Sequence, residues 1–390
     1  MAQPLYRLGD VGPPVAEIIA ALRVLGLLPP LDAPWGPGGI QAFETAAFDA
    51  HVDAAVRDFQ QQRGATVDGI VGPATWRLLG DARWRLGDRV LRYEPGHLLS
   101  GDDIAALQRR LFELGFNPGR ADGIFGNETE TALRDFQRNV GIRVDGTCGP
   151  ATFKALDRLA RTVVGGAPDA LREAEEIHRS GPALVGKVVV IDPGHGGRDL
   201  GNLGHGLVEA ELAEDLGARI EGRLAATGVT AYLTRGRLAA GDLPPTDAVR
   251  ADTANRLGAD LLLSLHVDSC LTPTANGVSS YFFGQRATGA RSAIGAKFAD
   301  LLQRELTART DLLDCRTHEK AWDLLRMTRM PAVWLEFGYA SNSADAARLA
   351  DPVFRDSLAE GVVVAVQRLY LQPDQDSPTG SIRLPDLVGG

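Results

Sequence analysis

Short apolar runs alternate with amphipathic stretches over the C-terminal half of the chain. The runs are too short for buried helices and are predicted to be buried strands, at residues 187–192, 230–234, 260–266, 277–283 and 331–337. Between them apolar residues recur every three or four positions, which predicts helices at about 208–226, 246–258, 288–308 and 353–371. This alternation is typical of one α/β domain, with a mixed or parallel sheet and helices on both of its faces.

The N-terminal half contains an internal repeat. Val56-Arg-Asp-Phe-Gln60 recurs 77 residues later as Leu133-Arg-Asp-Phe-Gln137. At the same distance, Asp68-Gly-Ile-Val-Gly-Pro-Ala-Thr-Trp76 recurs as Asp145-Gly-Thr-Cys-Gly-Pro-Ala-Thr-Phe153. Two copies of one small module therefore occupy residues 1 to about 160.

Each copy is predicted to form three short helices, which makes these two modules small all-α domains. In the second copy the helices are expected at about 104–114, at 131–140 and from Gly149-Pro150 onward, because apolar residues recur at helical spacing between glycine and proline breaks. The aromatic residues of the repeated motifs are expected in the cores: Phe59, Phe136, Trp76 and Phe153.

In combination, the D-F-Q and D-G-x-x-G-P-x-T motifs of both copies resemble the three-helix peptidoglycan-binding domain found beside bacterial wall hydrolases. The resemblance implies affinity for a muropeptide or a glycan fragment of peptidoglycan. The predicted boundaries are 1–84 for the first repeat, 85–160 for the second, 161–184 for a linker, 185–372 for the α/β domain and 373–390 for a polar, flexible tail.

Composition and charge exclude several classes of protein. Hydrophobic residues make up 44% of the chain and charged residues 23%, which is typical of a soluble protein. The net charge is −9, and the basic residues are dispersed among acids, so no nucleic-acid surface is expected. No apolar run approaches the roughly 20 residues that a membrane span requires.

The start of the chain lacks the cationic and apolar regions of a secretory signal. Cys148, Cys270 and Cys315 are odd in number and widely spaced, so no disulfide framework or thiolate zinc site is expected. These features favour a cytoplasmic protein. Association with the cell wall after export by another route is the alternative.

Four polar residues stand where an α/β domain builds its sites. His195 lies on the abrupt turn 192–197 after the first strand, Glu209 opens the next helix, and His266 and Glu336 end two further strands. Each has an ordinary structural explanation, such as a strand-end histidine or an acidic first helical turn. Together, two imidazoles and one carboxylate suit a catalytic zinc ion that keeps one position for water, and a further carboxylate such as Glu336 could take and return the proton.

The α/β domain resembles the zinc-dependent N-acetylmuramoyl-L-alanine amidases that share the D-P-G-H-G-G loop. The resemblance rests on Asp192-Pro-Gly-His-Gly-Gly197, Leu233-Thr-Arg235, Ser264-Leu-His266, Asn276-Gly-Val278 and Pro331-Ala-Val-Trp-Leu-Glu336. It implies a Zn²⁺ ion bound by His195, Glu209 and His266, with Glu336 as the general acid/base. The implied reaction is hydrolysis of the amide that joins the muramic acid lactyl group to L-alanine, with substrate contacts from Arg326, Asn255 and Asp268.

Two departures from that family bear on the site. Asp268 stands where an asparagine is usual, two residues after the second histidine. Glu211 lies close enough to Glu209 to compete as the ligand, although spacing from the apolar stripe of the helix favours Glu209.

The whole layout is also similar to the CwlM-type proteins of actinobacteria, some of which act without catalysis. That resemblance implies an alternative function, as a cytoplasmic activator of the first enzyme of peptidoglycan precursor synthesis. A Ser/Thr kinase would control it through the tail, with Ser381 or Thr379 as the acceptor. The partners expected from the sequence are therefore a muropeptide and, for the alternative, the precursor enzyme and the kinase.

Overall fold

The structure, a computed structural model, describes residues 4–29, 44–160 and 181–371 together with residues 173, 175 and 177. The predicted tail with Ser381 and Thr379, and most of the predicted linker, lie outside the described residues. The chain forms two compact units, of which one contains both repeats and the other most of the α/β domain. No helix in the described ranges is both long and apolar enough to cross a bilayer, and all three cysteines are free thiols.

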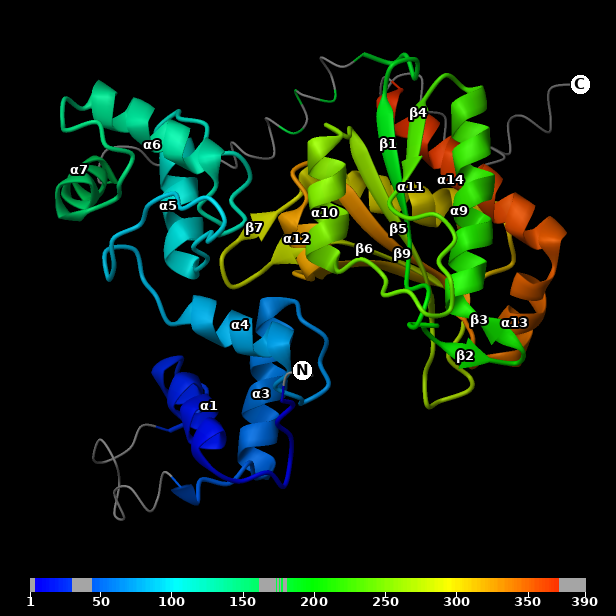
Figure 1. Cartoon of the computed structure of the whole chain (residues 1–390), viewed down its shortest axis with the longest axis horizontal. Helices are drawn as coiled ribbons and strands as arrows, with labels where there is room; N and C mark the ends of the chain where they lie inside the picture. Colours follow the sequence, from blue (N-terminus) through cyan, green and yellow to red (C-terminus); the bar gives the residue numbers. More distant parts are fainter. Residues whose placement is uncertain are drawn as a thin grey trace, which may run out of the picture. The chain divides into compact units, whose positions relative to one another are not determined.

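Each repeat folds as three helices around its own apolar core (Figure 1). The helices of the first repeat are α1 (Pro13–Val24), α3 (Ala50–Arg63) and α4 (Pro73–Ala82), and those of the second are α5 (Asp102–Glu113), α6 (Asn127–Asn139) and α7 (Pro150–Ala160). The prediction of small all-α repeats is thus confirmed, although α6 begins four residues before the expected Thr131. Acidic Glu128 and Glu130 in its first turn suit the positive end of the helix dipole.

Two of the four aromatic residues expected in the cores are fully buried. Phe59 and Phe136 are 1% and 0% exposed, whereas Phe153 is only partly buried. The expectation for Trp76 was wrong, because its side chain is 38% exposed and lies at the surface with its ring centroid 6.1 Å from that of Tyr6.

A buried glutamine explains why the D-F-Q and D-G-x-x-G-P-x-T motifs occur together in each repeat. The Gln60 side chain donates to Asp68 Oδ1 at 2.7 Å and to the Ile70 carbonyl at 3.0 Å. Its Oε1 accepts from the backbone N–H groups of Asp68 and Gly69, at 3.1 and 2.9 Å. The amide also reaches Thr75 Oγ1 at 3.2 Å, so one side chain ties the D-G turn to the start of α4.

The second repeat uses the same device twice. Gln137 makes the equivalent bonds to Asp145 at 2.9 Å and Thr152 at 3.0 Å. Gln108, on α5, binds Asp122 at 3.0 Å and Thr129 at 3.1 Å. The stretch from Asp122 to Thr129 has the pattern D-G-x-x-G-x-x-T, so this motif occurs three times, once more than the sequence comparison identified.

Replacing Gln60 by Leu is expected to loosen the first repeat. The substitution leaves two backbone N–H groups and one carbonyl without their buried partner, at a cost of about 1–3 kcal/mol for each unsatisfied group. We expect faster amide hydrogen exchange over residues 65–79, measured by mass spectrometry, and unchanged exchange in the α/β unit. Gln62→Leu is the matched control, since Gln62 is exposed on the same helix; equal effects of both substitutions would contradict this role.

The α/β unit is built on a mixed sheet with strand order β4-β1-β5-β9-β6-β7, with β8 also paired to β6. The strands are β1 (Val188–Pro193), β4 (Thr230–Leu233), β5 (Leu261–Asp268), β6 (Val278–Gln285), β7 (Ala290–Arg291), β8 (Asp314–Lys320) and β9 (Ala332–Tyr339). β1, β4, β5 and β9 pair in parallel, whereas β6 runs antiparallel to β9. A separate hairpin of β2 (Leu203–Gly204) and β3 (Leu207–Val208) precedes α9.

Helices cover both faces of this sheet, as the sequence predicted (Figure 1). They are α9 (Glu209–Ala226), α10 (Asp247–Arg256), α11 (Ala293–Arg309), α12 (Asp323–Met327), α13 (Ser343–Ala350) and α14 (Pro352–Tyr370). All five predicted strands are present. The helix expected at 288–308 begins only at Ala293, because residues 290–291 pair as β7 and the Ser292 hydroxyl caps the helix by accepting from Gly295 N.

Alternate residues of the central strands face two different environments. Val189, Ile191, Leu263 and Leu265 belong to the apolar core shared with α9, α11 and α14. Asp192, Ser264 and His266 point to the opposite face, because successive side chains of a strand alternate. A buried row of polar groups therefore runs across neighbouring strands, and it leads to the carboxyl end of β5.

Candidate metal centre

His195 lies on the turn that follows β1, with its backbone in the left-handed region (φ 56°). Histidine is one of the few residues other than glycine that adopt this region with some frequency. The residue before it must be glycine, since a Cβ at Gly194 would lie 2.3 Å from Cε1 of His266. The glycine therefore lets the turn pass close to the second imidazole.

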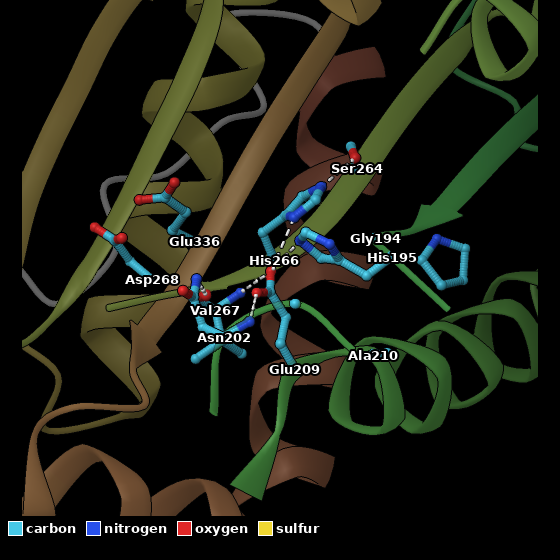
Figure 2. Close-up of polar contacts among 12 residues, drawn as sticks. Gly194, His195, Asn202, Glu209, Ala210, Ser264, His266, Val267, Asp268 and Glu336 are labelled. Atoms are coloured by element: carbon cyan, nitrogen blue, oxygen red, sulfur yellow. Dashed lines mark hydrogen bonds and ion pairs between the residues drawn. The ribbon is translucent and has the colours of Figure 1, made fainter. Parts of the chain in front are cut away.

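Glu209 begins α9 and joins the two histidines (Figure 2). Its side chain is 1% exposed, and its Oε1 lies 3.1 Å from His195 Nε2 and 2.9 Å from His266 Nδ1. Backbone N–H groups hold both oxygens, from Val267 to Oε1 at 3.0 Å and from Asn202 to Oε2 at 2.7 Å. A carboxylate accepts on both oxygens, whereas an amide would set its NH₂ group against one of these donors.

Glu211, the competing glutamate, is exposed on the same helix. Since Glu209 alone of the two contacts the imidazoles, the structure agrees with the choice that the apolar stripe of the helix favoured.

His266 is buried and held from two directions. Its ring stacks on Trp334, with centroids 3.4 Å apart and planes 5° apart. On its outer side, Nε2 lies 3.1 Å from Ser264 Oγ, which in turn donates to Asp192 Oδ2 at 2.6 Å. Because the serine proton goes to Asp192, the serine oxygen accepts from His266 Nε2–H. Nδ1, which faces Glu209, then carries the lone pair of the neutral ring and can act as a metal ligand.

Two further groups fix Asp192 in this chain of hydrogen bonds. Arg250 of α10 forms a buried ion pair with it at 3.2 Å, and the Thr234 hydroxyl donates to its other oxygen. For His195, the corresponding support is Asp199, whose carboxylate lies 2.8 Å from Nδ1. Each imidazole therefore has one nitrogen occupied by an oriented partner and the other nitrogen facing Glu209.

The electrostatics of the three groups fit this arrangement. Burial opposes the charged form of Glu209, but the two imidazoles hold the pKa of its carboxyl well below its usual range. Burial lowers the pKa of His266. Burial also acts to lower the pKa of His195, but the carboxylates of Glu209 and Asp199 outweigh it and raise that pKa.

The donor set matches the requirements of a zinc ion. One ligand atom from each of His195, Glu209 and His266 lies within 4.8 Å of the others. A tetrahedral ion with ligands at about 2.0–2.1 Å needs donor atoms roughly 3.3 Å apart, close to the separations of 2.9 and 3.1 Å around Glu209. Two neutral imidazoles and one carboxylate are also a donor set that zinc accepts in catalytic sites.

Glu336 lies on β9, directly beside His266 in the parallel register. Its Oε2 accepts hydrogen bonds from the hydroxyls of Tyr281 at 3.1 Å and Ser279 at 3.3 Å. Burial, and then the negative charge of Asp268, raise the pKa of Glu336 to about 8. Figure 2 shows the carboxylates of Glu336 and Asp268 on the same side of the site. A carboxyl group with a pKa near neutrality, next to a candidate metal centre, suits proton transfer.

Two residues expected to contact substrate, Asn255 and Arg326, belong to the helices α10 and α12. Asn255, at the end of α10, donates to the Met327 carbonyl at 2.9 Å and accepts from Arg329 N at 2.8 Å. Its amide thus fastens the segment before β9, near the amino ends of the strands, whereas His266 lies toward the carboxyl end of β5. Arg326 is buried in α12, which packs on α10.

Several residues of the site were not identified from the sequence. Asn202 positions Glu209 through its backbone and binds the Val267 carbonyl through its side chain at 2.8 Å. Asp199, Ser264, Tyr281 and Trp334 orient the other groups. Asp199, Ser264 and Trp334 lie close in sequence to His195, His266 and Glu336, and this proximity was the one available signal for them. Tyr281 had no such signal, because strand pairing alone brings it beside Glu336.

Comparisons with known proteins agree with this geometry. Residues 189–368 match the family described as N-acetylmuramoyl-L-alanine amidase, and residues 11–79 and 100–156 match the peptidoglycan binding domain. The chain is 47% identical to the N-acetylmuramoyl-L-alanine amidase CwlM of Mycobacterium tuberculosis over 386 residues, which cover 98% of this chain and 93% of that protein.

Two other similarities cover less than half of this chain. The N-acetylmuramoyl-L-alanine amidase LytC of Bacillus subtilis is 30% identical over 179 residues, or 46% of this chain and 34% of that protein. The solved structure of the amidase AmiC2 of Nostoc punctiforme is 28% identical, with a TM-score of 0.42, and the match covers 46% of this chain and 94% of that one. Given the near full-length similarity to CwlM, this chain belongs to the N-acetylmuramoyl-L-alanine amidase family.

Proposed function

We propose that this protein hydrolyses the amide bond between N-acetylmuramic acid and L-alanine, in peptidoglycan or in muropeptides, with a zinc ion bound by His195, Glu209 and His266. The convergence of these three side chains from three separate elements carries the proposal. The supports behind each of them add to it, because orienting groups on metal-binding histidines tune affinity and geometry.

Zinc, when bound there, would supply Lewis acidity and a water of lowered pKa. The other parts of the proposed mechanism rest on residues of this chain. Asp199 and Ser264 orient the two imidazoles through their remote nitrogens, so that the other nitrogen of each ring faces Glu209. Glu336, held by Tyr281, takes a proton from the attacking water and returns it to the leaving amine of L-alanine.

The repeats, in this proposal, hold the enzyme on its polymer. The family match of both repeats supports a peptidoglycan fragment as their ligand. Retention on a polymer raises the local concentration of scissile bonds without any change at the catalytic centre. The predicted boundaries of the repeats, the linker and the α/β domain form part of this proposal.

The direct test is incubation of the full chain with an N-acetylmuramoyl-peptide and analysis of the products by mass spectrometry. We expect the free sugar acid and a peptide with a new L-alanine amino terminus. Cleavage between amino acids, or between sugars, would contradict the proposed bond specificity. No products at all, from protein with a full complement of zinc, would contradict catalysis.

The charge of Asp268 is expected to set the pH dependence of the reaction. If Glu336 accepts the proton first, kcat/KM rises with pH as this carboxyl ionises. Asp268→Asn removes a negative charge that raises the pKa of Glu336, so the ionised form persists to lower pH and the acidic limb of the profile moves to lower pH. A zinc ion bound at the site shifts the acidic limb in the same direction in the native protein and in Asp268→Asn, so the difference between the two profiles remains.

The measurement is a pH series of kcat/KM for both proteins, with Glu211→Gln as the exposed control. An acidic limb that stays in place in Asp268→Asn, or that moves to higher pH, would show that Asp268 does not act on Glu336 in this way.

A further inference from the structure

The strand β8, which pairs with β6, contains a residue with a strained backbone. Arg316 adopts a left-handed backbone conformation with φ 68°, although it carries a Cβ, and this conformation is strained for most residues other than glycine. Glycine would remove this strain, whereas arginine places a cationic side chain at the same position. The side chain is exposed.

Hydrogen bonds of the residues next to Arg316 stabilise this backbone conformation. Asp314 Oδ1 accepts from Arg316 N at 2.8 Å and from the buried Gln303 side chain of α11 at 2.8 Å. One residue further along, the Thr317 hydroxyl donates to Asp300, also on α11, at 2.9 Å. Side chains on either side of Arg316 thus fasten the strand to its helix, while Arg316 itself is left exposed.

His318 connects this turn to the site. Its ring centroid lies 5.5 Å from that of Tyr281, and its Nε2 is fixed by the Cys315 carbonyl at 2.8 Å. The Tyr281 hydroxyl in turn donates to Glu336 at 3.1 Å. Arg316 and His318 are both exposed and two residues apart on one strand, so a series of contacts leads from Glu336 through Tyr281 to His318, beside Arg316.

The guanidinium of Arg316 makes no hydrogen bond or ion pair with any residue in the part of the chain that the structure describes. An arginine in this position offers a planar pair of donors that matches a carboxylate. Since a peptide spans at most about 3.3–3.6 Å per residue, a group on the second residue of a bound stem peptide lies roughly 7 Å from the scissile bond. The hydrogen bond from Tyr281 to Glu336 and the ring contact between Tyr281 and His318 are the observations that connect β8 to this part of the substrate.

We propose that Arg316, with His318 beside it, binds the carboxylate of the residue that follows L-alanine in the stem peptide. The subsite rests on the proposed amidase function, because it names a part of that substrate. It would make a free carboxylate at this residue a determinant of specificity, and an amidated one a poorer ligand.

The test uses the full chain with Glu336→Gln, which prevents turnover, with and without Arg316→Gly. The probes are two N-acetylmuramoyl dipeptides that differ only in whether the carboxylate of the second residue is free or amidated. By calorimetry we expect the acid to bind about threefold to tenfold tighter than the amide when Arg316 is present. The ratio is expected to fall to about one in Arg316→Gly and to recover in part in Arg316→Lys.

Folding gives an independent readout. Because glycine relieves the left-handed strain but adds freedom to the unfolded chain, Arg316→Gly is expected to melt at a temperature between equal to that of the native protein and roughly 4 °C higher. Weaker discrimination in a protein that is no less stable cannot be attributed to misfolding. An acid-to-amide ratio near one before substitution, or a ratio that Arg316→Gly leaves unchanged, would overturn the subsite.

Turnover by the chain without substitutions separates this proposal from the amidase itself. A protein that cleaves both probes but binds them equally keeps the amidase function and loses the subsite. Conversely, a protein that discriminates between the probes in binding and cleaves neither keeps the subsite and loses the catalytic function.

Discussion

Replacing Glu336 by Gln is expected to reduce kcat for cleavage of a muramoyl-peptide by about 10²–10⁴-fold, the range typical of a lost general acid/base. Glutamine has the same shape, and its carbonyl oxygen can still accept from the hydroxyls of Tyr281 and Ser279. It cannot take up and return a proton. Zinc content should remain unchanged, because Glu336 lies outside the His-Glu cluster.

The comparison requires kcat and metal content on the same preparations. Asp268→Asn serves as the matched control, since it alters the neighbouring carboxylate and should shift the pH profile without abolishing turnover. Activity of Glu336→Gln within tenfold of the native protein would assign proton transfer to another group.

Loss of Glu209 is expected to remove the metal. Glu209→Ala deletes one of three proposed ligands, and zinc affinity should fall by more than the roughly 10- to 100-fold that follows loss of a residue that merely supports a ligand. Activity should fall with it below detection. The substitution also leaves the backbone N–H groups of Asn202 and Val267 without their acceptor, so circular dichroism must accompany the metal analysis.

Glu211→Ala is the control for this experiment, because Glu211 lies two residues further along the same helix and is exposed. It should retain zinc and activity. If Glu209→Ala folds and binds zinc as tightly as the control does, the proposed ligand set is wrong.

The main elements of the α/β unit could be predicted because its strands are continuous apolar runs and its helices carry clear stripes. The prediction failed where neither signal exists. β8, with the sequence Asp-Cys-Arg-Thr-His-Glu-Lys, has no apolar alternation and is a strand because β6 pairs with it. The helix α11 was expected too early, since its apolar pattern gives no sign that residues 290–291 pair as β7.

The titratable groups of the site could be predicted from the sequence, but the residues that orient them by hydrogen bonds could not. His195, Glu209, His266 and Glu336 are recognisable as imidazoles and carboxylates at the ends of strands and the start of a helix. The role of Ser264 depends on its face of β5, where it lies between Asp192 and His266. For Asn255, which was expected to contact substrate, no sequence pattern indicated that its side chain would bind the backbone of Met327 and Arg329.

Titration of zinc into metal-free protein, with amide cleavage measured at each addition, tests most directly the claim that His195, Glu209 and His266 hold the ion that hydrolysis requires. We predict that activity rises linearly from zero and saturates at one equivalent of zinc per chain. Full activity before any zinc is added would contradict this account. A protein that binds one equivalent and stays inert would also contradict it, and would favour the alternative, in which the protein regulates precursor synthesis without catalysis.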